Sequence, residues 1–125
     1  MNDKPYDLEE RTYTFALEVR QLLRNVTWNP TSWTDVKQLL RSSGSVAANY
    51  IESIEAISNP DSIYRLRITK KEARESGLWL RLLNDCNPLG KEDHEALQDL
   101  LSETNELVKI FASILRKKST NEPLP

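Results

Sequence analysis

The stretch VKQLLRSSGSVAANYIESIEAI, residues 36–57, indicates how this chain folds. Its apolar and small residues recur at spacings of three and four, the period of an α-helix that turns one face toward a core. The members of this stripe are Val36, Leu39, Leu40, Ser43, Val46, Ala47, Tyr50, Ile54 and Ile57. The pattern predicts a helix that follows a cap at Thr31 or Ser32 and continues to about residue 57.

The middle of this helix, residues 42–48, consists almost wholly of serine, glycine and alanine. Glycine and serine each cost about 0.5–1 kcal/mol in a helix relative to alanine. Close approach of a neighbouring backbone is the simplest compensation, because the side chains at a helix contact set the distance between the axes. We therefore expect a tight helix contact at this point.

Three further segments show the same periodicity. Asp7 and Glu10 form a capping pair before a helix that extends to residue 26. Asn59 as cap, with Pro60 in the first turn, begins a helix over residues 60–85, and a fourth helix covers residues 91–117. The connections are short, so neighbouring helices are antiparallel. We predict an all-α, up-down-up-down four-helix bundle over residues 1–118 and a flexible C-terminal tail over 119–125.

Composition restricts the class of protein. The chain has 125 residues, a net charge of −2, three glycines and one cysteine. That length fits one domain with one core, and the few glycines argue against phosphate-binding loops. No run of 18 apolar residues and no signal-type N-terminus is present, and a lone cysteine suits a reducing compartment. We expect a cytoplasmic protein with no membrane contact.

The third helix carries more apolar surface than the interior of one bundle requires. Its main stripe includes Ile63, Leu66 and Leu80, and a second apolar line lies on a neighbouring face. Surplus apolar surface of this kind marks partner sites. The alternative is that this line packs under the loop at residues 28–33. The residues predicted to form an interface between copies are Ser43, Gly44, Ala47, Ala48, Asn49, Glu52, Tyr64, Ile68, Trp79 and Leu82.

Three segments resemble a known bacterial family. Residues 7–16 resemble the opening of the four-helix-bundle proteins of the 23S rRNA intervening-sequence family. Residues 38–52, QLLRSSGSVAANYIE, look like the signature segment of that family. Residues 71–75, KEARE, followed by Trp79, Leu80, Leu82 and Leu83, look like its third-helix motif. The resemblance covers roughly residues 6 to 84.

This resemblance implies an antiparallel four-helix bundle that assembles into a homopentameric ring. It implies almost no biochemistry, because most members have no assigned activity. A related branch, the accessory variability determinant of diversity-generating retroelements, is a strongly basic pentamer that binds nucleic acid and a reverse transcriptase. The net charge of −2 separates this chain from that branch.

Candidate catalytic groups are scarce. The single histidine, His94, lies near a helix start and is expected to be solvated, and Cys86 is expected to be a buried or half-buried apolar residue. A di-iron centre in a bundle needs Glu-x-x-His on two helices, and only one histidine exists. No Walker-type or Gly-x-Gly loop is present. The sequence therefore predicts no catalytic, cofactor or metal site.

A basic face on the third helix supports a different function. Between residues 60 and 83 there are six basic and three acidic residues. Arg67, Lys71 and Arg74 follow spacings of four and three, so they share a face that could contact phosphates. The alternative is a solvated face with intrahelical pairs such as Lys71–Glu75. We predict a non-enzymatic homo-oligomeric scaffold or adaptor with itself as partner. The second hypothesis is an RNA- or DNA-binding accessory protein.

Overall fold

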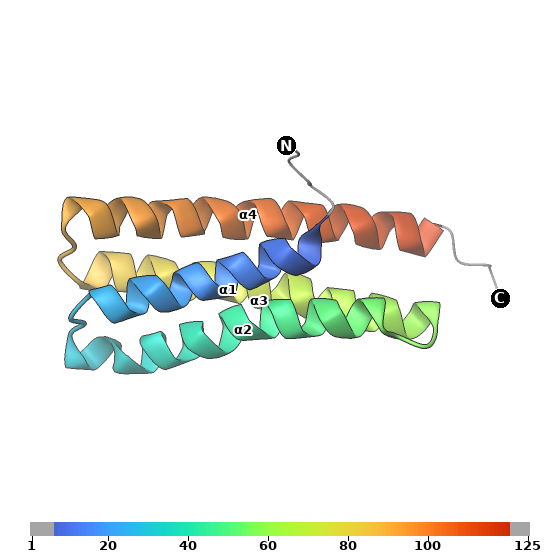
Figure 1. Ribbon diagram of the computed structural model, residues 1–125, viewed down its shortest axis with the longest axis horizontal. Helices are drawn as coiled ribbons and strands as arrows, with labels where there is room; N and C mark the ends of the chain where they lie inside the picture. Colours follow the sequence, from blue (N-terminus) through green and yellow to red (C-terminus); the bar gives the residue numbers. More distant parts are fainter. Residues whose placement is uncertain (1–6, 121–125) are drawn as a thin grey trace.

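Four long helices form the described part of the chain. The computed structural model describes residues 7–120. The helices are α1 (Leu8–Asn25), α2 (Trp33–Ile54), α3 (Asn59–Cys86) and α4 (Lys91–Thr120), with a 3-10 turn, η1 (Pro30–Ser32), before α2. Consecutive helices run in opposite directions (Figure 1). The predicted all-α, antiparallel four-helix architecture is therefore confirmed.

The helix starts follow the predicted capping chemistry with small shifts. The Asp7 carboxylate accepts a hydrogen bond from the Glu10 backbone N–H at 3.2 Å, as predicted. The cap of α3 is Ser58, one residue before the predicted Asn59, and its hydroxyl accepts from the Asp61 N–H at 3.3 Å. Ser32 caps α2 without a side-chain hydrogen bond, because η1 leads directly into the helix.

The second helix ends earlier than its apolar stripe predicted. It stops at Ile54, and Ile57 is 95% exposed. Residues between Ile54 and the Ser58 cap must reverse the chain into α3, so Ile57 leaves the helical register. At the same end of the molecule, α4 continues to Thr120, two residues into the predicted tail (Figure 1). The rest of that tail lies outside the described residues.

The core is built from the predicted stripes of all four helices. Its largest fully buried side chains include Phe15, Leu39, Leu80 and Phe111. The helices α1 and α4 are further joined by Arg11, whose guanidinium donates to both carboxylate oxygens of Glu103 at 2.8 and 2.9 Å. α1 has 18 residues and α4 has 30, about 27 and 45 Å at 1.5 Å per residue. The first helix therefore covers only part of the bundle's length (Figure 1).

The loop at residues 28–33 is attached to the C-terminal end of α3. Trp28 is buried, whereas Trp33 is 60% exposed. The backbone N–H of Asn29 donates to the Asn87 side-chain oxygen at 2.8 Å, and the Asn87 amide donates to the Ser32 hydroxyl at 2.9 Å. Tyr64 lies in the first turns of α3, far along the helix from this loop. The loop therefore does not account for the whole second apolar line.

Candidate functional site

The small residues of α2 allow direct contact with α3. Ser42 and Ser43 are fully buried. The Ser42 hydroxyl lies 2.7 Å from the Ser76 hydroxyl of α3, which is also fully buried. Ser76 donates in turn to the Glu72 carbonyl at 2.9 Å. The predicted tight contact thus occurs on the α3 side of α2.

On the other side of α2, a long side chain from α1 fills the space. The Arg20 guanidinium donates to the Ser43 hydroxyl at 3.2 Å and to the Leu40 carbonyl at 3.3 Å. A Cβ atom added at Gly44 would lie 3.1 Å from the Arg20 Nη2. The neighbour at Gly44 is therefore a side chain and not the backbone that the sequence analysis expected. Ser43 offers no surface to another molecule because it is fully buried in the single chain.

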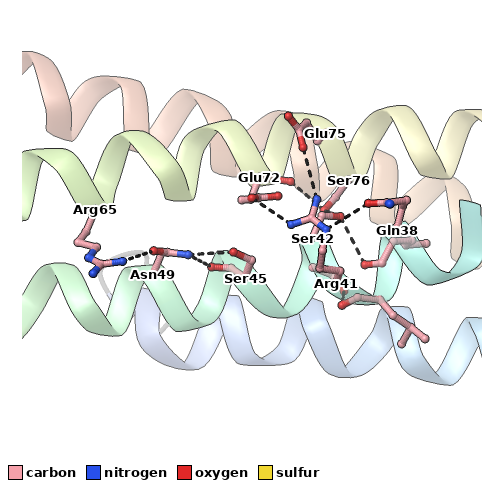
Figure 2. A network of polar contacts seen from close by, with 12 residues as sticks. Gln38, Arg41, Ser42, Ser45, Asn49, Arg65, Glu72, Glu75 and Ser76 are labelled. Carbon is pink, nitrogen blue, oxygen red and sulfur yellow. Dashed lines mark hydrogen bonds and ion pairs between the residues drawn. The ribbon is translucent and has the colours of Figure 1, made fainter.

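A polar network runs along the flank between α2 and α3 (Figure 2). Arg41 contacts Gln38 at 3.1 Å, Glu72 at 3.2 Å and Glu75 at 3.6 Å. The Glu72 side chain is 8% exposed, and its Oε1 has no hydrogen-bond partner among residues 7–120. An unpaired buried carboxylate is costly. Arg41 therefore stabilises α3 against α2 by neutralising this buried charge.

Asn49 belongs to the same flank. Its amide donates to the Ser45 hydroxyl at 2.9 Å and to the Ser45 carbonyl at 3.0 Å, and its oxygen accepts from Arg65 at 3.2 Å. Figure 2 shows this group bridging the two helices. Its hydrogen bonds are thus made inside the chain. Beside it on α2, Ala47 is half-buried, whereas Ala48 and Glu52 are exposed.

The second apolar line of α3 divides between interior and surface. Trp79 packs against the core, and its buried indole N–H has no hydrogen-bond partner in the part of the chain that the structure describes. Ile68 and Leu82 are half-buried and lie outside the group packed against that core. Tyr64 is 60% exposed, with the Arg65 guanidinium carbon 5.7 Å from its ring centroid. Part of the predicted line is therefore available to a partner.

The three basic residues predicted for nucleic-acid contact are all exposed. Arg67, Lys71 and Arg74 form no ion pair with any residue in the described range 7–120. The pair between Lys71 and Glu75, which the alternative of a solvated face would include, is absent there, and Glu75 contacts Arg41 of α2 instead.

A groove between α3 and α4 adds residues that the sequence analysis did not single out. Its volume is about 1210 Å³. Lys71 and Arg74 line it together with Arg81 of α3 and Lys109 of α4, and Glu75 and Asp85 contribute acidic groups. Arg81 stands seven residues after Arg74, a spacing that could have indicated a shared side of the helix. Lys109 could not be found this way, because only the packing of α4 brings it beside α3.

The candidate nucleophile and base are both at the surface. His94 is exposed, and its Nδ1 lies 3.1 Å from the Asn84 side-chain oxygen. Cys86 is exposed at the last position of α3, so the expectation of a buried or half-buried residue is wrong. The reason is that α3 ends there, and its core stripe ends with Leu83. No group of three or more His, Cys, Asp or Glu within residues 7–120 has a metal-binding arrangement.

Tyr50 has a phenol whose pKa is clearly shifted by its environment. Partial burial raises the pKa of its phenol above the usual 10.0, and the carboxylates of Glu9 and Asp7 raise it further. Its ring lies 5.8 Å from the Phe111 ring, centroid to centroid. These contacts place the start of α1 beside the second half of α2.

Among the described helices, none is long and apolar enough to span a bilayer.

Comparisons with known proteins agree with this architecture. The family model described as 23S rRNA-intervening sequence protein matches residues 5–110. A crystal structure of a protein with unknown function from the S23 ribosomal protein family of Bacteroides thetaiotaomicron is similar, with 30% identity and a TM-score of 0.74. The match covers 86% of this chain and 94% of that one. No curated protein matches. The chain therefore belongs to the 23S rRNA-intervening sequence protein family.

Proposed function

We propose that this protein is a non-enzymatic scaffold that assembles with copies of itself, as a homopentameric ring in the cytoplasm. One observation carries the proposal: the outer face of α3 keeps apolar side chains that the core does not use. Tyr64 is 60% exposed and Leu78 is 47% exposed. The two residues lie on one side of α3, fourteen residues apart, and exposed apolar surface on a folded chain supports a partner site. Five copies are what the family resemblance implies.

The surroundings of the two reactive side chains support a role without catalysis. A nucleophile in an active site has a base within hydrogen-bond reach, which a third group orients. His94 instead contacts the Asn84 amide group on an exposed surface. Cys86 lies at an exposed helix end, and a single exposed thiol suits a reducing compartment.

Measuring the mass in solution tests self-association directly. At tens of micromolar, light scattering of the eluted protein should give five times the chain mass of 14.4 kDa, about 72 kDa. Tyr64→Glu should lower the mass toward one chain, because a carboxylate would have to be desolvated in the contact. Gln98→Glu, which adds the same charge at an exposed position of α4, should leave the mass unchanged. A wild-type mass of one chain would refute the proposal.

A specific observation also favours nucleic-acid binding as a second candidate. Arg67, Lys71 and Arg74 are exposed without an ion-pair partner in the described range, and two of them line the groove beside Arg81 and Lys109. Phosphate contacts depend on such local charge more than on the net charge of the chain.

A titration with a labelled RNA at two salt concentrations tests this candidate. Replacing Arg67, Lys71 and Arg74 by glutamine should weaken binding and lower the slope of log K against log salt by about 2–3, since each phosphate contact contributes about 0.7–0.9. Lys37→Gln, at an exposed position of α2, serves as the control. No binding at low salt would remove this candidate.

A further inference from the structure

A second exposed apolar surface lies on α1 and α2. It consists of Tyr13 (55% exposed) and Leu17 (39%) of α1, with Ile51 (42%) and Ile54 (51%) of α2. We call these four residues the α1–α2 patch. None of them belongs to the core cluster or to the side chains packed against it.

The packing of α1 against α2 brings these four residues together. Arg20 reaches the Leu40 carbonyl and the Ser43 hydroxyl, and the two helices are antiparallel (Figure 1). Residues one and two turns before Arg20 therefore lie beside the turns of α2 that follow Ser43. Glu9 of α1 also lies near enough to Tyr50 of α2 for its carboxylate to add to the effect of burial in raising the pKa of that phenol. Leu17 and Tyr13 thus face the same side as Ile51.

The rim of the α1–α2 patch is acidic. Glu9 and Glu10 of α1 and Glu52 and Glu55 next to α2's isoleucines are all exposed. Residues 42–58 contain no lysine or arginine. Within residues 8–19 the one basic residue is Arg11, which is bonded to Glu103 of α4. Arg20, one turn after Leu17, and Lys118, which lines a hollow with Ile54, add two cations beside the patch. The patch is therefore apolar in its middle, and its edge carries more carboxylates than cations.

The outer face of α3 has the opposite charge. Its exposed apolar residues, Tyr64 and Leu78, are accompanied by Arg67, Lys71 and Arg74, which are exposed and form no ion pair in residues 7–120. We call these five residues the α3 face. The molecule thus carries two apolar surfaces of complementary charge.

We infer that the α1–α2 patch of one copy packs against the α3 face of the next copy, in a head-to-tail contact. The inference rests on the proposed self-association and names the two surfaces that form it. A ring of more than two copies needs a heterologous contact, in which each copy contributes two different surfaces. A symmetric contact in which either surface meets its own copy would place carboxylates against carboxylates or cations against cations, and like charges at an interface are unfavourable.

Mixing two variants tests this geometry. One variant carries Tyr13→Gln and Ile51→Gln, which damages the α1–α2 patch. The other carries Tyr64→Gln and Leu78→Gln, which damages the α3 face. Each should elute as a single chain of 14.4 kDa. An equimolar mixture should form a heterodimer of about 29 kDa and grow no further, because one intact patch meets one intact face.

Other outcomes separate this inference from the proposed self-association. If the wild type assembles and the α1–α2 variant assembles equally well, the patch is not in the contact and the inference is wrong, while self-association stands. If both variants are single chains and their mixture stays so, the contact is not head-to-tail. If the wild type is itself a single chain, both proposals fail.

Three further measurements guard against trivial explanations. Circular dichroism should show wild-type helicity, because all four substituted side chains are largely exposed. A second patch variant, Leu17→Gln with Ile54→Gln, should reproduce the effect of the first. Raising the salt concentration should lower the fraction of heterodimer, since the rims carry opposite charges and salt screens them.

Discussion

The two neighbours of α2 contact it in different ways. Toward α3 the contact is short and inflexible: two buried serine hydroxyls lie 2.7 Å apart, and Arg41 pairs with the nearly buried Glu72. Toward α1 the space over Gly44 is filled by the end of the Arg20 side chain, which can move. One run of small residues therefore serves two purposes. It allows close packing on one side and accommodates a long cation on the other.

The largest effect is expected on the α3 side. Ser42→Leu should lower the free energy of unfolding by about 1–3 kcal/mol, because a larger side chain cannot fit against Ser76 without displacing α3. Urea denaturation measures the change. Ser102→Leu, the same substitution at an exposed position of α4, should change stability by no more than about 0.5 kcal/mol. Equal losses in the two variants would show that the Ser42–Ser76 contact is not tight.

A pair of glycine substitutions compares an adjustable contact with a rigid one. Gly44→Ala should stabilise the protein by up to about 1 kcal/mol, because alanine favours the helix and the Arg20 end can shift. At Gly77 a new Cβ would lie 3.2 Å from the hydroxyl of buried Thr104, which donates to the Leu101 carbonyl at 2.7 Å. Gly77→Ala should therefore gain less or lose stability.

Thermal and urea unfolding of both glycine variants, at one protein concentration, measure this difference. The expected order of stability is Gly44→Ala, wild type, Gly77→Ala. If Gly77→Ala proves as stabilising as Gly44→Ala, Thr104 moves as readily as Arg20, and the contrast between a rigid and an adjustable neighbour does not hold.

The smallest effect concerns the electrostatic contact of α1 with Tyr50. Burial and the carboxylates of Glu9 and Asp7 raise the phenol pKa in the folded protein above 10.0. The unfolded chain therefore ionises first as pH rises. The stability associated with the neutral phenol is complete below pH 10 and is lost as pH increases through the raised pKa.

Denaturation at about pH 8 and about pH 11, on either side of the tyrosine pKa, checks this contact. Wild type should lose more stability between these values than Tyr50→Phe does. Tyr64→Phe, which removes an exposed phenol, should behave like the wild type. An identical loss in wild type and Tyr50→Phe would mean that neither burial nor the α1 carboxylates raise the pKa of Tyr50.

Much of the fold was predictable because it depends on local patterns. The stripes through Leu39, Leu80 and Phe111 identified the core, and the caps at Asp7 and near Pro60 located helix starts within one residue. The end of α2 was predicted three residues too late, because Ile57 fits the stripe although the chain turns before it. The spacing of apolar residues does not show where a helix must end so that the chain can turn into the next helix.

The candidate surfaces were only partly predictable. The exposure of Tyr64 and of the three basic residues on α3 follows from their positions off the core stripe. The α1–α2 patch went unnoticed, although Tyr13 and Leu17 stand four residues apart outside the stripe of α1. The sequence also did not show whether the isoleucines of this patch are buried or exposed, since Ile54 belonged to the predicted core stripe and is 51% exposed.

By itself the sequence determined that this chain forms four antiparallel helices, because helical periodicity and capping act between residues close along the chain. Only the tertiary structure decided the partners of its side chains. Glu75 contacts Arg41 of α2 although Lys71 lies one turn away, and Arg20 of α1 covers Gly44. The physical reason is distance. Such contacts depend on how the helices pack and on how far long side chains reach between them. The order of residues along the chain specifies neither the packing nor the reach.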